Sequence, residues 1–255
     1  MRILVTNDDG IHAPGLTVAE SIAHSLSDDV WVVAPETEQS GASHSLTLSV
    51  PLRVRAIAAQ RFAVSGTPTD CVMMAVMELM PDGRPDLVLS GVNSGSNLAD
   101  DVTYSGTVAA AMEGCALDIP SIALSQAFEE GGRDSIDWSA ARTFGAPLVR
   151  QLMGIGWPKG TLINVNFPAC PAAEVTGVEA VAQGLRAMEN TTFDKRLDRR
   201  GRPYYWAGVR KEVETPEPGT DLGAVFGKKI SVTPLHLNLT EHAVLETLRQ
   251  ALGKD

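Results

Sequence analysis

Short apolar runs alternate with longer amphipathic patterns over the first two thirds of the chain. Ile3, Leu4 and Val5 form a continuous apolar run, which is typical of a strand buried on both faces. From Leu16 onwards, apolar residues recur at helical spacing, which predicts an amphipathic helix. Because strands and helices keep alternating, the sequence predicts an α/β fold with a mostly parallel sheet. Strands are predicted over residues 2–6, 30–34, 61–64, 86–90, 119–125 and 161–167, and helices over residues 16–26, 67–80, 105–115 and 138–153.

Two of these segments carry more specific expectations. The helix 67–80 is apolar nearly all round, so we expect it to be deeply buried. Extended segments at 45–50 and 52–57, on either side of Pro51, predict a hairpin between the second strand and this helix.

The pattern changes beyond about residue 171. A charged stretch at 194–202 separates two strand-like segments, and a further strand and an amphipathic helix capped by Thr240 close the chain. The strand-like segments cover residues 177–187, 203–209 and 229–235, and the helix covers residues 240–252. This segment carries more large apolar side chains than a solvated tail needs, among them Tyr204, Tyr205 and Trp206. We therefore expect a single domain over 1–255, with a core up to about residue 170 and a C-terminal hairpin and helix appendage that joins subunits.

Composition and charge narrow the function classes. The chain has 255 residues, of which 44% are apolar and 20% charged, so a globular protein is expected. The formal charge of −10 argues against a surface that coats nucleic acid, and it means that an anionic substrate must be attracted locally. Cys71, Cys115 and Cys170 lie far apart, which favours buried reduced thiols over disulfides or zinc. With no leader or membrane-length apolar run, a cytoplasmic protein without membrane contact is expected.

Polar turns follow three of the predicted strands. They are Asn7-Asp8-Asp9-Gly10, Gln39-Ser40-Gly41 and the stretch 91–95, which contains Asn93. In a doubly wound sheet such turns lie along one edge, so they can converge. Two carboxylates, a hydroxyl and an amide oxygen suit Mg²⁺, Mn²⁺ or Ca²⁺ rather than zinc or copper. For the aspartates alone, a solvated turn that caps the next helix remains the alternative.

A second candidate element is the helix start Ser105-Gly106-Thr107. Its free N–H groups and the positive end of the helix dipole can bind a phosphate without Lys or Arg. The alternative is that Ser105 only caps its helix. We call this helix start the phosphate cradle. A metal site beside it would provide the minimum set of groups for phosphate-ester hydrolysis. Motifs of kinases, dehydrogenases and serine hydrolases (GxxxxGK[ST], GxGxxG and GxSxG) are absent from the sequence.

Motifs along nearly the whole chain resemble the SurE (survival protein E) family of metal-dependent 5′/3′-nucleotidases. They read NDDGIHAPG, APETEQSGASHSLTL, GTPTDCV, SGVNSGSNLADDVTYSGTVAAAMEG, NVNFP, GRPYYWAG and GTDLGAVFGKKISVTPL. The resemblance implies metal ligands at Asp8, Asp9, Ser40 and Asn93, and phosphate-binding groups at Asn97, Ser105, Gly106 and Thr107.

The resemblance also implies a Rossmann-like core and one divalent cation per subunit, Mg²⁺ or Mn²⁺, with Ca²⁺ as a substitute. The implied reaction is dephosphorylation of nucleoside 5′- and 3′-monophosphates, with short polyphosphate as a further substrate among members. The C-terminal segment would be exchanged between subunits of a homodimer or homotetramer. Relatives often carry basic residues where this chain has Glu36 to Gln39, which leaves base and substrate preference open.

In the mechanism that this suggests, the cation positions and acidifies a water while the turn 105–107 holds the phosphoryl oxygens. One aspartate, with Asp8 favoured, accepts a proton, although the sequence does not decide between the two. A metal-dependent deacetylase is the alternative enzyme, but such enzymes normally add His ligands and a following Glu, and Asn7 and Gly10 occupy those places here. A non-catalytic nucleotide sensor is the third hypothesis, and the presence of all four oxygen ligands argues against it.

Overall fold

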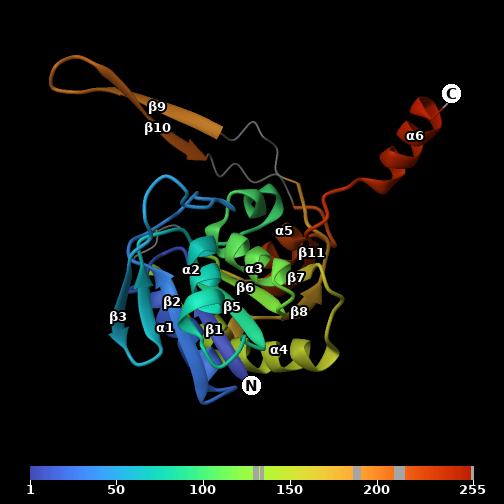
Figure 1. The fold of residues 1–255 in the computed structure, drawn as a ribbon. Coiled ribbons are helices and arrows are strands. Elements are labelled where there is room, and N and C mark those ends of the chain that lie inside the picture. The colour runs from blue at the N-terminus through green and yellow to red at the C-terminus, as the bar shows by residue number, and fades with distance from the viewer. Residues whose placement is uncertain (129–131, 133–134, 186–190, 210–215, 254–255) are drawn as a thin grey trace.

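A nine-stranded sheet forms the middle layer of the molecule, in the order β3-β4-β2-β1-β5-β6-β7-β11-β8 (Figure 1). The computed structural model describes residues 1–255 except 129–131, 133–134, 186–190, 210–215 and 254–255. The strands of this sheet are β1 (Arg2–Thr6), β2 (Asp29–Pro35), β3 (Val54–Ala58), β4 (Arg61–Val64), β5 (Leu87–Ser94), β6 (Ser121–Gln126), β7 (Thr161–Phe167), β8 (Gly177–Ala180) and β11 (Lys229–His236).

Helices cover both faces of the sheet and complete three layers (Figure 1). On one face, α1 and α4 pack against Ile3 and Val5, and on the other, α2 and α3 pack against Leu4. Ile3, Leu4 and Val5 of β1 therefore point alternately to opposite faces and are all buried, which confirms the predicted α/β fold. The helices are α1 (Pro14–His24), α2 (Pro68–Met74), its π-helical continuation Ala75–Leu79, α3 (Gly106–Ala116), α4 (Ser139–Ile155), α5 (Asp221–Phe226) and α6 (His242–Leu252), with 3-10 turns at Ala99–Thr103 and Ala172–Glu174.

The strand order reverses at β1. This strand pairs in parallel with β2 on one side and with β5 on the other, because the chain first builds outward through β2 and then returns to β5. In open α/β sheets, ligands bind beyond the carboxyl ends of strands at such a switch point. The turn after β1 and the end of β5 therefore lie where a ligand site is expected.

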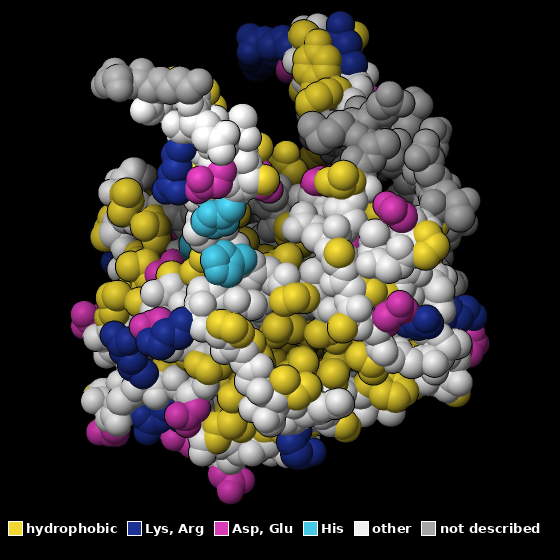
Figure 2. All heavy atoms as spheres, turned by 90° about the vertical axis from the view of Figure 1, so that its right-hand side faces the viewer, with side chains coloured by type: hydrophobic (Ala, Val, Ile, Leu, Met, Phe, Trp, Pro, Cys, Tyr) yellow, Lys and Arg dark blue, Asp and Glu magenta, His cyan; other side chains and the backbone are white. Residues whose placement is uncertain are grey.

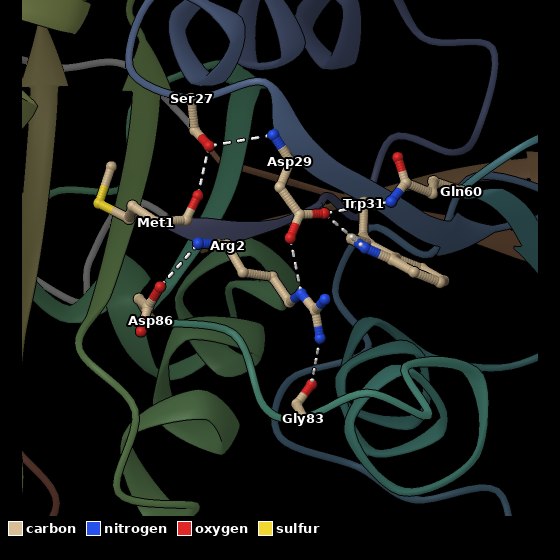
Figure 3. A network of polar contacts seen from close by, with 8 residues as sticks. All are labelled: Met1, Arg2, Ser27, Asp29, Trp31, Gln60, Gly83 and Asp86. Carbon is tan, nitrogen blue, oxygen red and sulfur yellow. Dashed lines mark hydrogen bonds and ion pairs between the residues drawn. The ribbon is translucent and has the colours of Figure 1, made fainter.

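The opposite end of β1 is held by a polar network around Arg2 and Asp29 (Figure 3). Arg2 Nε donates to Asp29 Oδ2 at 2.8 Å, and its Nη1 donates to the carbonyl of Gly83 at 3.0 Å. The other carboxylate oxygen of Asp29 accepts bonds from Trp31 Nε1 at 3.0 Å and Gln60 Nε2 at 3.1 Å. These contacts join β1 to β2 and to the loop before β5 at the end of the sheet away from the switch point.

The helix expected over 67–80 forms, but it is not buried all round. Thr67 and Asp70 make the predicted capping box at its start. Cys71 packs into the core, whereas Met77 on the outer side is 58% exposed. The expectation of deep burial was therefore wrong for the outer face, because the sheet covers only one side of this helix.

The extended pair or hairpin expected on either side of Pro51 does not form, although residues 54–57 of the second expected segment are extended in β3. The antiparallel pair is β3 with β4, and residues 45–53 contain no strand. This segment is tied to the start of α2 instead, because Thr47 N–H donates to Asp70 Oδ1 at 3.2 Å and Thr67 Oγ1 donates to the carbonyl of Ser45 at 2.7 Å.

Part of the chain beyond residue 171 belongs to the main sheet. Strand β11 lies between β7 and β8, antiparallel to the first and parallel to the second. A hairpin of β9 (Thr191–Leu197) with β10 (Pro203–Val209), together with α6, projects from the body of the molecule (Figure 1).

Three boundaries in this region differ from expectation. The first residues of the charged stretch are strand rather than loop, because β9 runs to Leu197. The segment expected as a strand over 177–187 is regular only in β8, and residues 186–187 lie outside the described part of the chain. Helix α6 is capped by Glu241, whose side chain accepts the N–H of Ala243, rather than by Thr240.

The three cysteines are buried free thiols, as expected. Burial raises the pKa of Cys71 well above its usual range and raises that of Cys115, so both stay protonated at neutral pH. Among the helices that the structure describes, none combines the length and apolarity needed to cross a bilayer.

Candidate metal and phosphate site

Asp8 and Asp9 lie in a tight turn directly after β1. Asn7 closes this turn, since its Nδ2 donates to the carbonyl of Gly10 at 3.0 Å and its Oδ1 accepts the Gly10 N–H at 3.2 Å. Asp8 is only 4% exposed, whereas Asp9 is partly exposed. A carboxylate held this far from solvent needs charge or hydrogen bonds to stabilise it.

The start of α3 packs directly on Asp8. Thr107 Oγ1 donates a hydrogen bond to Asp8 Oδ1. A Cβ at Gly106 would lie 2.7 Å from Asp8 Cβ and 3.1 Å from Pro68 Cγ, so only glycine allows this approach. The two predicted elements, acidic turn and phosphate cradle, are therefore one site.

Strand β5 brings Asn93 and Asp9 together. We expected this strand to end at Ser90, but it continues to Ser94, with a shift of register against β6 between Ser90 and Asn93. The N–H of Ser94 donates to Asp9 Oδ2 at 2.9 Å. Asn93 Nδ2 donates to the carbonyl of Gly95 at 2.9 Å, so the oxygen is the end of this amide suited to a cation.

Ser40 is brought to the acidic turn by the backbone of its own loop. The N–H of Gln39 donates to the carbonyl of Asp8 at 2.8 Å. Ser40 Oγ donates to Glu38 Oε1 at 2.7 Å. The four predicted metal ligands thus come from the acidic turn, the loop after β2 and the end of β5, and the last two segments each contact the acidic turn.

Ser105 caps α3, which is the role that the alternative hypothesis gave to this residue. Its Oγ accepts the N–H of Val108 at 3.0 Å. A cap of this kind leaves other N–H groups of the first turn without helical partners, and these groups are the ones that bind anions. Capping and phosphate binding are therefore compatible at this helix start.

Asn97 anchors the segment between β5 and α3. Its Nδ2 donates to Ser125 Oγ at 2.8 Å, and its backbone N–H donates to Asn166 Oδ1 at 2.7 Å. Its carbonyl accepts bonds from Asn164 at 2.8 Å and Asn166 at 3.1 Å. The side chain of Asn97 is thus engaged inside the protein, and it holds the backbone that leads to the start of α3, the candidate phosphate cradle.

Glu38 and the two partners of Asn97, Asn164 and Asn166, were not among the predicted site residues. The signal for both asparagines was present, since they interrupt an otherwise apolar strand. Such buried amides need hydrogen-bond partners, but the sequence does not identify them.

The donor set fits a hard divalent cation. Two carboxylates with one hydroxyl and one amide oxygen match the preferences of Mg²⁺ and Mn²⁺. No group of three or more His, Cys, Asp or Glu side chains able to hold a metal is found among the described residues.

These features define a doubly wound α/β protein with a candidate oxygen-ligand metal site and a candidate anion-binding helix start at its switch point. The family model of Survival protein SurE matches residues 3–190, and the chain belongs to this family. The 5′-nucleotidase SurE of Methylobacterium radiotolerans is 57% identical over 254 residues, which cover 100% of both chains. That of Parvibaculum lavamentivorans is 55% identical over 253 residues, 99% of this chain and 91% of the relative. The crystal structure of SurE protein from Aquifex aeolicus superposes with a TM-score of 0.86 at 39% identity, covering 98% of this chain and 99% of that one.

Proposed function

We propose that this protein is a metal-dependent nucleotidase that hydrolyses nucleoside 5′-monophosphates to a nucleoside and inorganic phosphate. The single observation that carries the proposal is the packing of Gly106 and Thr107 on Asp8, which joins a phosphate cradle to a cation site. The 5′-nucleotidase SurE relatives, more than half identical over nearly full length, support the same reaction.

One Mg²⁺ or Mn²⁺ per subunit is held by Asp8, Asp9, Ser40 and Asn93. When bound, the cation would lower the pKa of a water molecule and offset charge that develops on the phosphoryl oxygens. Asp8 is favoured over Asp9 as the proton acceptor, because Asp8 lies against the cradle in which the phosphoryl group would sit.

The first turn of α3 binds the phosphoryl oxygens. Its backbone N–H groups are aligned by the Ser105 cap, and the helix dipole favours an anion there without a basic side chain. The hydroxyl of Thr107 donates a hydrogen bond to Asp8, and this bond fixes the position of the phosphate-binding turn relative to the cation ligand. This arrangement also suits 3′-monophosphates and short polyphosphates, which we include in the proposed substrate range.

The protein acts as a homodimer or homotetramer. The projecting hairpin carries exposed aromatic residues, with Phe193 at 68%, Tyr205 at 56% and Trp206 at 58% exposed, and α6 has no buried residue. A second copy of the chain is the natural cover for such surfaces. Buried free thiols fit a cytoplasmic, reducing compartment.

The test is release of inorganic phosphate from AMP by the full-length protein with Mg²⁺ or Mn²⁺, measured beside release of acetate from an acetylated substrate. A nucleotidase releases phosphate only, a deacetylase releases acetate only, and a sensor binds AMP while releasing neither. Either of the last two results would refute the proposal.

A further inference from the structure

The carboxylate of Glu38 accepts the hydrogen of the Ser40 hydroxyl. Ser40 Oγ lies 2.7 Å from Glu38 Oε1. A serine hydroxyl has one hydrogen and two lone pairs, and it ligates a cation through a lone pair. The hydrogen must then point to another acceptor, and Glu38 supplies one from the same loop.

The backbone of this loop is packed on the acidic turn. Gly10 has a φ of +101°, and a Cβ there would lie 3.3 Å from the carbonyl carbon of Thr37 and 3.4 Å from the nitrogen of Glu38. The loop backbone thus passes close to Gly10. Together with the hydrogen bond from Gln39 N–H to the carbonyl of Asp8, this close approach fixes the position of the Glu38 backbone. The backbone of Glu38 therefore lies against the acidic turn, and its carboxylate contacts Ser40, a predicted metal ligand.

The neighbouring carboxylate in the loop has a different partner. Glu36 Oε1 accepts bonds from Arg55 Nη2 at 3.1 Å and Nε at 3.2 Å. Glu36 and Glu38 are thus both exposed carboxylates in the same loop, but of the two only Glu38 contacts a proposed metal ligand. Glu36 is a matched control for Glu38.

We propose that Glu38 is a positioning residue for the cation site: its carboxylate holds the Ser40 hydrogen and so turns the Ser40 lone pairs toward the cation. This inference rests on the proposed function, because it requires Ser40 to be a metal ligand. Glu38 acts through Ser40 and does not itself touch substrate.

The test is calorimetric titration of the metal-free full-length protein with Mn²⁺, in the absence of substrate. Glu38→Ala should weaken binding about fivefold or more, since the bond to a charged acceptor is lost. Glu38→Gln keeps an oxygen acceptor and should restore affinity to within about twofold of the parent. Glu36→Ala should bind Mn²⁺ as the parent does. Circular dichroism and Tm establish that each variant is folded.

A double-mutant cycle separates positioning from simple charge. In a Ser40→Ala background, Glu38→Ala should cause no further loss, because its only route to the cation has been removed. An equal loss in both backgrounds, or failure of Glu38→Gln to restore affinity, would mean that the charge acts directly and would overturn the inference. Parent-like binding by Glu38→Ala would overturn it as well.

The same titrations distinguish failure of this inference from failure of the proposed function. If Ser40→Ala and Asp8→Asn weaken Mn²⁺ binding while Glu38→Ala does not, the cation site stands and only the role of Glu38 is refuted. If Ser40→Ala and Asp8→Asn both bind Mn²⁺ like the parent, the cation site itself is wrong, and the role of Glu38 is refuted with it.

Discussion

Asp8 accepts a hydrogen bond from Thr107 through its side chain and another from Gln39 through its backbone carbonyl. It thereby connects α3 and the loop after β2 to the end of β1. A divalent cation at this turn would place a positive charge beside the buried carboxylate of Asp8. Substitution of this residue should therefore affect metal binding and turnover together.

Asp8→Asn should lower kcat for AMP hydrolysis by at least ~100-fold, because it removes a charge from the cation site and the favoured proton acceptor. Excess chelator should abolish phosphate release by the parent, and added Mg²⁺ or Mn²⁺ should restore it. A phosphate-release assay across metal concentrations measures both effects. Full activity of the parent in excess chelator would contradict metal dependence.

Substitution of Thr107 by valine tests the cradle, because valine has nearly the same shape as threonine but no hydroxyl. Thr107→Val removes the hydroxyl that donates to Asp8 and should cost about 1–3 kcal/mol of transition-state stabilisation, measured from kcat/KM. Thr107→Ser keeps the hydroxyl and is the control, with activity expected close to that of the parent. If Thr107→Val is folded and as active as the parent, this hydroxyl has no part in the reaction.

At the scale of elements, the site depends on how β1 and β5 end. Their parallel pairing brings Asp9 within hydrogen-bond distance of Ser94, although the two residues are far apart in the sequence. The network at the other end of β1 fixes the same strand through Arg2 and Asp29 (Figure 3). Both ends of the strand are thus held by side-chain contacts with its neighbours.

The Arg2–Asp29 pair predicts a pH dependence of stability. The hydrogen bond from Arg2 lowers the pKa of Asp29 below its ordinary value near 3.8. A lowered pKa means that the carboxylate stabilises the folded state above the unfolded pKa, and that this contribution is lost as pH falls through the folded pKa. Denaturant unfolding from about pH 6 to below about pH 4 should therefore show a smaller acid loss of stability for Asp29→Asn than for the parent. Equal losses would show that the pair adds no stability, as is common for exposed pairs.

Elements with strong local patterns were predictable. The buried run of β1 and the capping residues Thr67 and Asp70 act over a few positions, so the sequence alone locates them. The expectation that Asp8, Asp9, Ser40 and Asn93 lie close together came from sheet topology and from a family resemblance, and it stays a prediction. The structure shows that the acidic turn contacts the loop after β2 and the end of β5.

Side-chain pairings across long separations were not predictable. The contact of Asn97 with Asn166 spans 69 positions, and the strands that make it possible carry no local sign of the partner. The bond from Ser40 to Glu38 depends on loop conformation, which residue preferences do not fix. The extension of β5 to Ser94 was missed because Gly91 and Asn93 usually mark a turn.

At the scale of the whole molecule, the segment beyond residue 171 has two parts with different roles. Strands β8 and β11 complete the sheet, whereas the β9–β10 hairpin and α6 project from it. Hydrophobic side chains are visible over the face of the molecule shown in Figure 2. Val244, Leu248 and Leu252 of α6 are 53%, 48% and 79% exposed.

Two truncations separate these roles. A chain ending at residue 171 should aggregate or fail to fold, because the edge of β7 loses β11 and is left unpaired. A chain ending at residue 240 keeps the sheet and should fold, but it should assemble less tightly than the parent. Sedimentation of the full-length protein at micromolar concentration should give a dimer or tetramer. A full-length monomer would contradict the proposed assembly.

The position of β11 also sets an order of events during synthesis of the chain. Residues 177–180 of β8 leave the ribosome well before residues 229–236, yet β8 joins the sheet only through β11. The growing chain therefore carries β7 as an open edge until nearly the whole protein has emerged. An open edge on an apolar sheet recruits other strands, so a nascent chain at this stage is a target for chaperones and for aggregation. The last strand of the sheet to be made is the one that ends this exposure.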